Sequence, residues 1–319
     1  MNLSATLDFA KTYFKLGPDG RRWARSRRKA DARHPRRPRI PLLENAADRR
    51  ELLRKLVICD QAFRECMPEH LPQNFGRRRD DVYARIVPFA MINLLIRCRL
   101  LDAYGIAYDR AAEVRLAAFV FCTREWNDVI ENRDPNVAAG AIVSESKPET
   151  AYFLLRNFSR ALERILPKDG DQAYAGFKRN SLERLPHLDF GDTSEARLRA
   201  FAAFSLKGGY SVMFPEIPER LGQAIQPFAQ WLYSLDELSD YRRDKAARRP
   251  TYFTTLPDPI AEMRRITADC ENVIRGEAVA PDRVLSLMTY LTDEIVKAYE
   301  AGRDLEREIF GAAAAASSS

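Results

Sequence analysis

The sequence predicts an all-α protein, most simply a single-domain helical bundle. Apolar residues recur at three- and four-residue spacing over long stretches, which is the periodicity of amphipathic helices. Glycine is scarce, with 14 residues among 319. No run of alternating β-branched residues is long enough for a sheet, and no internal repeat of the roughly 33 to 45 residues typical of solenoids is visible.

The periodic segments place helices, in chain order, at residues 45–66, 80–103, 109–132, 147–165, 171–184, 193–213, 217–244, 258–275 and 281–309. Turn-forming sequences rich in Pro and Gly separate most of them. In order along the chain these are MPEHLPQNFG, DPNVAAG, LPKDG, LPHLDFGD, FPEIP and LPDP. The tail GAAAAASSS, residues 311–319, is of low complexity, and we expect it to be disordered.

The net charge of +6 is unevenly distributed. Residues 21–39 hold ten basic residues and one acid, a charge of +9, which leaves the rest of the chain at −3. We therefore expect a basic, flexible arm over residues 1–40 and a helical catalytic domain over residues 41–310. Such an arm could grip nucleic acid, anionic lipid or an acidic protein. The arm shows no helix-turn-helix pattern, and its basic stretch, residues 21–39, has one aromatic residue, Trp23, so no nucleic-acid partner is expected.

Several classes of site lack the residues they would need. The five cysteines contain no CxxC pair, and the three histidines lie far apart in sequence. A disulfide framework, a zinc site and a Ser-His-Asp triad are therefore not expected. No stretch reaches the ~18 apolar residues of a membrane span. The N-terminus lacks the layout of a signal peptide, which favours a cytoplasmic protein. Any chemistry must then use carboxylates, Arg and Lys.

The segment from 225 to 253 contains a row of carboxylates. Asp236, Asp240 and Asp244 follow one another at four-residue spacing, so they share one face of the predicted helix. The same face, traced backwards, is apolar and would point into the core. Stacked carboxylates of this kind suit hard divalent cations such as Mg²⁺. The alternative is a surface helix whose acids pair with nearby basic residues, namely Arg242, Arg243, Lys245, Arg248 and Arg249.

A second acidic segment, REWNDVIENRD, lies at the end of the helix predicted at 109–132. Asn127 and Glu131 are four residues apart and Asp128 and Glu131 three, so their oxygen atoms share a face. Read alone, this segment could equally be a helix end with ordinary surface charges. Two acidic helix ends in one helical chain make a metal site the better hypothesis.

Together these motifs resemble the class I isoprenoid synthases, which include the prenyl diphosphate synthases and class I terpene synthases. NDVIE (127–131) stands where the first DDxxD motif of that superfamily would be, and DELSD (236–240) where the second would be. FSLKGGYSVMF (204–214) resembles the family's kinked helix, with Lys207 matching its Lys and Gly208 replacing its Thr. The layout is most similar to the tetraprenyl-β-curcumene synthase-like bacterial terpene synthases, over about residues 80–255.

The resemblance implies a helical fold that binds Mg²⁺, through more than one ion, and a linear prenyl diphosphate. It assigns metal binding to Asn127, Asp128, Glu131, Asp236, Asp240 and Asp244. Diphosphate binding falls to Arg124, Arg133, Lys207, Arg248 and Arg249. Lys207, Gly208 and Gly209 are the catalytic candidates, since glycines inside a helix cost roughly 1 kcal/mol each and favour a break that bares carbonyls. A glycine pair that packs at a helix crossing is an equally good interpretation.

Three functions follow as hypotheses. The first is a Mg²⁺-dependent terpene synthase, which releases a hydrocarbon or alcohol and pyrophosphate. The second is a chain-elongating prenyltransferase, which would also need isopentenyl diphosphate; the missing Thr after Lys207 favours the first. The third, of another class, is a non-catalytic helical protein that binds through its basic arm. Whether the chain forms a homodimer is left open.

Overall fold

The computed structural model describes residues 15–33, 46–68, 78–133, 148–166 and 193–303, apart from 215, 247 and 249. Over these ranges the chain forms α-helices joined by turns, two short 3-10 helices and no strand, so the all-α prediction is confirmed there. None of the described helices combines the length and apolar content that crossing a membrane requires.

Most helices agree closely with the prediction from sequence. In chain order they are α2 (Pro18–Arg33), α3 (Ala46–Cys66), α4 (Arg79–Ala103), α5 (Arg110–Arg133), α7 (Pro148–Ile165), α9 (Glu195–Ser211), α10 (Gly222–Ala246), α11 (Pro259–Glu277) and α12 (Asp282–Glu300). The 3-10 helices are η6 (Glu219–Leu221) and η7 (Phe253–Thr255). The helix predicted at 171–184 and the tail at 311–319 lie outside the described residues.

Two predicted boundaries are wrong, and each has a local cause. The helix predicted from residue 217 starts at Gly222, because Pro218 leads instead into the 3-10 turn η6. The last helix ends at Glu300 rather than 309. Gly302 takes a left-handed φ of 71°, its N–H bonds to the Tyr299 carbonyl and that of Arg303 to the Ala298 carbonyl. This is the Schellman motif, which ends a helix at glycine.

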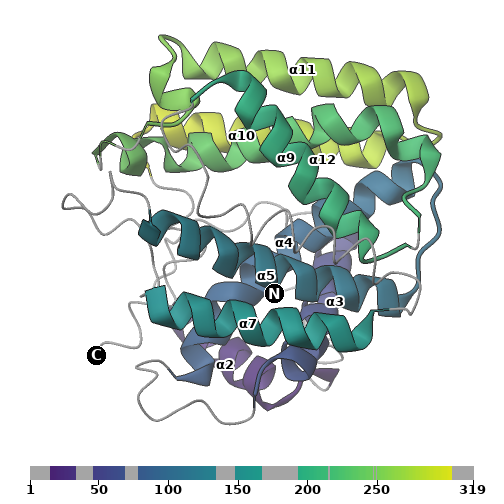
Figure 1. Ribbon diagram of the computed structural model, residues 1–319, viewed down its shortest axis with the longest axis vertical. Coiled ribbons are helices and arrows are strands. Elements are labelled where there is room, and N and C mark those ends of the chain that lie inside the picture. Colours follow the sequence, from purple (N-terminus) through teal and green to yellow (C-terminus); the bar gives the residue numbers. More distant parts are fainter. Residues whose placement is uncertain are drawn as a thin grey trace.

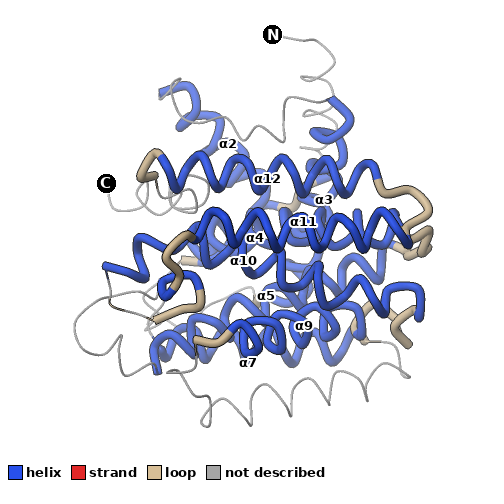
Figure 2. Tube along the Cα trace, turned by 90° about the horizontal axis from the view of Figure 1, so that it is seen from above, coloured by secondary structure: helices blue, strands red, loops and turns tan. Residues whose placement is uncertain are grey.

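The helices form two groups joined by α9 (Figure 1). α10, α11 and α12 pack against one another on one side, and α5 and α7 lie side by side on the other. α9 runs obliquely between the groups and contacts both α10 and α5. The view at right angles again shows α11 and α12 running alongside each other (Figure 2).

α4 is the central helix of the fold. Every residue from Leu94 to Leu101 is buried, and α4 packs against α2, α3, α5 and α12. A helix that is apolar on all sides belongs in the interior of a protein. The run nevertheless contains two charged residues, Arg97 and Arg99, at 3% and 4% exposure. Their environments differ, and that difference bears on the candidate site.

α2 is docked on the body of the protein through a buried carboxylate. Asp60 of α3, fully buried, accepts hydrogen bonds from the Gly17 N–H (2.9 Å), the Tyr83 hydroxyl (3.0 Å) and Arg64 Nε (3.1 Å). A side chain at Gly20 would put Cβ 2.4 Å from Asp60 Oδ1, so only glycine allows this approach. The start of α2 is thereby fixed to both α3 and α4.

Further contacts strengthen the docking of α2. Arg22 pairs with Asp80 at 2.5 Å, and Arg79 Nε lies 2.9 Å from Asp19. The Trp23 ring lies 6.4 Å from that of Tyr83, centroid to centroid. The flexible arm predicted for residues 1–40 is therefore wrong for residues 15–25, which are packed. Apolar periodicity did not predict this helix, because RRWARSRRKADAR has no apolar stripe.

Replacing Asp60 tests the docking. We expect Asp60→Ala to lower the free energy of unfolding by about 3 kcal/mol, because it leaves a buried N–H and a buried hydroxyl without an acceptor. The matched control is Asp80→Ala, which removes the exposed ion pair between Asp80 and Arg22 of α2. This loss should lower the free energy of unfolding by less than about 1 kcal/mol. Urea unfolding of both variants measures the difference. Equal losses would show that Asp60 does not anchor α2.

Candidate functional site

The carboxylate row of α10 runs from the surface into the protein. Asp236 is exposed, the Asp240 side chain is 14% exposed and Asp244 is buried, at 3%. Earlier on the same helix, Ile225, Phe228 and Ala229 are buried, as predicted for the inward face. Asp240 forms an ion pair with Arg243. The row therefore combines features of both interpretations, since one carboxylate pairs with a neighbour and another is withdrawn from solvent.

The first acidic motif lies on the last turns of α5. The helix continues to Arg133, which places Asn127, Asp128 and Glu131 on one continuous helical segment. Their side chains, and that of Arg133, lie outside the described residues. Among the residues whose side chains are described, no group of three or more His, Cys, Asp or Glu is placed to hold a metal ion. The predicted pairing of the two acidic motifs therefore stays a prediction.

The predicted diphosphate ligands lie in different settings. The Arg124 guanidinium stacks over the Phe89 ring, 5.1 Å from its centroid. Lys207 is exposed on α9. Arg248 is exposed just beyond α10 and has a φ of 55°, unusual for a residue with a side chain. Arg249 lies outside the described residues.

The glycine pair does not break its helix. α9 continues through Gly208 and Gly209 to Ser211, so the predicted break is wrong. A Cβ on Gly209 would lie 2.4 Å from Arg97 Nη1 and 3.2 Å from Leu116 Cδ1. At Gly209 the packing interpretation is therefore confirmed, because the missing side chain makes room for a guanidinium of α4. The catalytic role predicted for this pair loses its structural basis, the bared carbonyls.

Arg97 is a buried cation that the sequence analysis did not select. Its Nη1 donates one long hydrogen bond, 3.4 Å, to the Ser205 carbonyl of α9, and its buried Nε has no partner. No carboxylate pairs with it among the described residues. Burial lowers the pKa of Arg97. An arginine within the apolar run LLIRCRLL is the signal that could have identified it.

Arg97 belongs to a polar cluster, which we define as Arg97, Ser205, Tyr210, Tyr233 and Asp236. The Tyr210 hydroxyl, fully buried, donates to the Arg97 carbonyl at 3.2 Å. Burial raises the pKa of Tyr233 to about 12, a shift that the side chain of Ser205 and the charge of Arg97 oppose and that of Asp236 increases. The charges of Arg97 and of Asp236, the first carboxylate of the α10 row, thus act on the same hydroxyl group in opposite directions. The cluster links α4, α9 and α10 at the place where α9 crosses the bundle.

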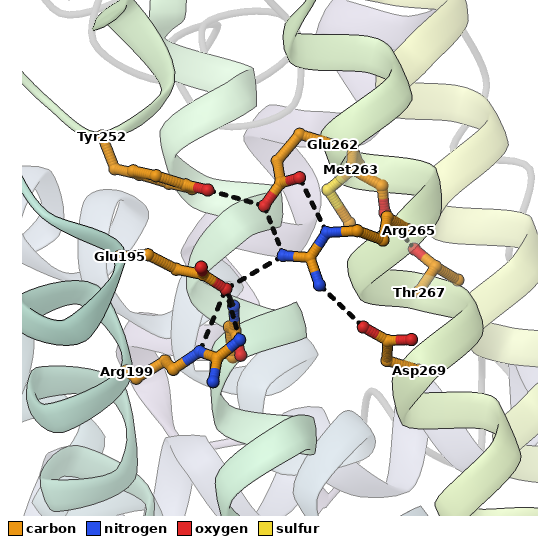
Figure 3. A network of polar contacts seen from close by, with 9 residues as sticks. Glu195, Arg199, Tyr252, Glu262, Met263, Arg265, Thr267 and Asp269 are labelled. Carbon is orange, nitrogen blue, oxygen red and sulfur yellow. Dashed lines mark hydrogen bonds and ion pairs between the residues drawn. The ribbon is translucent and has the colours of Figure 1, made fainter. Parts of the chain in front are cut away.

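A second polar network holds α9 against α10 and α11 (Figure 3). Glu195 accepts hydrogen bonds from Arg199, from Arg265 Nη2 (2.9 Å) and from Gln230 Nε2 (2.8 Å). Burial alone would raise the pKa of Glu195, but these hydrogen bonds outweigh it and lower the pKa. Arg265 also bridges Glu262 and Asp269 on its own helix. Every charge here has an opposite partner, so the network is structural.

A surface pocket of about 530 Å³ opens at the end of α10, away from the carboxylate row. Lys245 Nζ lies 3.0 Å from the Tyr241 hydroxyl on its rim, and Tyr299 packs edge-on against Tyr241. Residues 241 and 245 lie on a different face of α10 from 236, 240 and 244. The pocket is therefore separate from the predicted metal site.

The cysteines do not supply a nucleophile. All five are free and buried. Burial raises the pKa of the Cys98 thiol to about 11 and that of Cys66 to about 12, and it also raises the pKa of Cys59 and Cys270. Because the thiolate is the reactive form, these groups are inert at neutral pH.

The chain was compared with known protein families, characterised proteins and solved structures. No family model matches it, and no characterised protein or solved structure matches it either. The site is therefore interpreted from its own residues.

Thiol labelling tests the burial of the cysteines. We expect all five to resist iodoacetamide at pH 8 in the native protein and to react in guanidinium chloride, because labelling needs an accessible thiolate. Mass spectrometry counts the labelled thiols in each state. Rapid modification of a native cysteine would show that its surroundings open to solvent.

Proposed function

We propose that the protein is a Mg²⁺-dependent class I terpene synthase that ionises a linear prenyl diphosphate. The single observation that carries the proposal is the carboxylate row of α10, which leads from exposed Asp236 to buried Asp244. The acidic side chains of a surface helix are ordinarily exposed to water. Burying a carboxylate is costly unless cations or hydrogen-bond donors compensate it, and a bound metal ion is the cation that we propose for this row.

The donor set fits magnesium. Carboxylate oxygens at four-residue spacing on one helix are hard ligands, and Mg²⁺ commonly binds through one or two such groups together with substrate phosphates. Asp236, Asp240 and Asp244 would hold the ion from α10, and Asn127, Asp128 and Glu131 from the end of α5. Bound Mg²⁺ would supply charge neutralisation for the diphosphate leaving group.

The protein's own cations would complete the binding of the diphosphate. Arg124, Arg133, Lys207, Arg248 and Arg249 remain the proposed diphosphate ligands, and fixed cations lower the barrier to leaving-group departure by preorganised electrostatics. The left-handed backbone of Arg248 supports its inclusion. Such a conformation is costly for a residue with a side chain and tends to persist at functional sites.

Two alternatives remain as hypotheses. A chain-elongating prenyltransferase would use the same metal site and would need isopentenyl diphosphate as a second substrate. A non-catalytic binding protein would use α2, whose sixteen residues hold seven basic and two acidic side chains. The packing of residues 15–25 favours neither enzyme nor binding protein, because it fixes the helix without showing what the helix contacts.

Turnover assays test the proposal. We expect the full-length protein to release pyrophosphate, only with Mg²⁺, from one of geranyl, farnesyl, geranylgeranyl and geranylfarnesyl diphosphates, each supplied with and without isopentenyl diphosphate. Extracts analysed by gas chromatography distinguish a cyclase from a chain-elongating enzyme. Asp236→Asn and Asp240→Asn should lower kcat/KM about a hundredfold or more, because each removes a metal ligand.

The matched control is Asp269→Asn on α11, which removes an exposed carboxylate paired with Arg265 and should leave turnover unchanged. Absence of turnover with every substrate, together with no Mg²⁺-dependent binding of diphosphate, would refute the proposed function.

A further inference from the structure

Two buried arginines of α4, two residues apart, have opposite surroundings. Arg99 Nη2 contacts Asp48 at 2.5 Å and Glu51 at 3.1 Å, so its charge is compensated by α3. Arg97, at 3% exposure, has only the long hydrogen bond to the Ser205 carbonyl. The fold therefore provides carboxylates for one buried arginine and none for the other, within the residues it describes.

A buried cation without a counter-charge is costly to the folded protein. An arginine in this position is usually paired or replaced by an apolar residue of similar size, which is often neutral or stabilising. The helix α9 supplies a carbonyl and the space left by Gly209, but no negative charge. An unused guanidinium Nε is also a strong donor that is directed at no acceptor.

The polar cluster to which Arg97 belongs contains hydroxyl groups. Ser205 of α9 is buried and Tyr233 of α10 interacts with its side chain, while the charge of Arg97 acts on Tyr233. A guanidinium with adjacent hydroxyls is the arrangement that recognises planar or tetrahedral oxyanions. The two glycines of α9 weaken this stretch of helix, which lowers the cost of its moving to admit a ligand.

We propose that Arg97 is the cationic centre of a binding position for a phosphate-type oxyanion, where α4, α9 and α10 meet. The anion accepts hydrogen bonds from the Arg97 guanidinium and supplies the negative charge that the fold lacks. This position is centred on α4 rather than on the carboxylate row of α10, of which only Asp236 belongs to the same polar cluster, and it needs no metal. Its identification with a phosphate group of the substrate rests on the proposed function, but its affinity for an oxyanion does not.

A pair of arginine variants separates binding from structural support. Arg115 donates to the turn that follows α9, with Nε 2.7 Å from the Val212 carbonyl and Nη2 3.0 Å from the Met213 carbonyl. Burial lowers the pKa of Arg115 as it does that of Arg97. Arg115 therefore has the partners that Arg97 lacks, which makes Arg115→Met the matched control for Arg97→Met.

The experiment is calorimetric titration of the full-length protein with inorganic pyrophosphate in EDTA, at constant ionic strength, alongside thermal unfolding. We expect the wild type to bind, Arg97→Met to bind at least tenfold more weakly, and Arg115→Met to bind as the wild type does. Without ligand, Arg97→Met should unfold at the same or a higher temperature, whereas Arg115→Met should unfold a few degrees lower because two carbonyls lose their donors.

Gly209→Ala provides a second variant that keeps the charge. Its Cβ would occupy the space next to Arg97 Nη1, so the guanidinium must move, and pyrophosphate binding should weaken at least tenfold. Parallel titrations with inorganic phosphate and with farnesyl diphosphate, both in EDTA, distinguish the source of the anion. Tighter Arg97-dependent binding of the prenyl compound identifies the substrate, and equal affinities identify free phosphate.

Pyrophosphate binding that is absent in the wild type or unchanged in Arg97→Met would overturn the inference. So would a loss of stability in Arg97→Met as large as that in Arg115→Met, which would make Arg97 structural. Arg97-dependent binding without turnover of any prenyl diphosphate would refute the proposed function and leave this inference standing.

Discussion

The arrangement of this protein depends on how the charges of α4 are accommodated in its interior. α4 is enclosed by α2, α3, α5 and α12, and a charged side chain on a helix in that position is costly unless a neighbour compensates it. Arg99 forms ion pairs with Asp48 and Glu51 of α3, which hold α3 against α4. Glu51 also forms an ion pair with Arg283 of α12, at 2.7 Å. One buried cation thus fixes helices from both ends of the chain.

The same principle explains why Asp60 controls the placement of α2. A fully buried carboxylate needs donors from more than one direction, and Asp60 obtains them from a backbone N–H, a tyrosine and an arginine on three segments. Two glycines at the start of α2 allow the backbone to come close enough. The hydrogen bonds that compensate the buried Asp60 carboxylate are therefore also the contacts that dock the start of α2.

The sequence predicted the elements whose signals are local. α3, α5, α7 and α11 agree with the prediction to within two residues, because apolar periodicity and flanking Pro or Gly are read over a few turns. α2 escaped prediction because its stability comes from Asp60, 43 residues from Gly17 in sequence. The glycine pair of α9 was misread for a similar reason. Its local cost is real, but the guanidinium that occupies the space belongs to α4.

Part of the candidate site followed from sequence and part could not. The four-residue spacing of Asp236, Asp240 and Asp244 placed them on one face of α10, and the inward burial of that face was predictable from the apolar residues before it. That Arg97 lacks a counter-charge, while Arg99 has two, depends on which residues of α3 and α9 face α4. Periodicity along one helix carries no information about its neighbours.

The docking of α2 also shapes the molecule's electric field. α2 carries a net charge of +5, nearly all of the +6 of the whole chain, and its start is fixed on α3 and α4. A charge fixed on one side of a rigid body contributes to a permanent dipole of that body, whereas the same charge on a loose tail would average over many directions. An approaching anion would therefore be turned toward a defined side of the protein before any contact forms, and added salt would weaken this orientation.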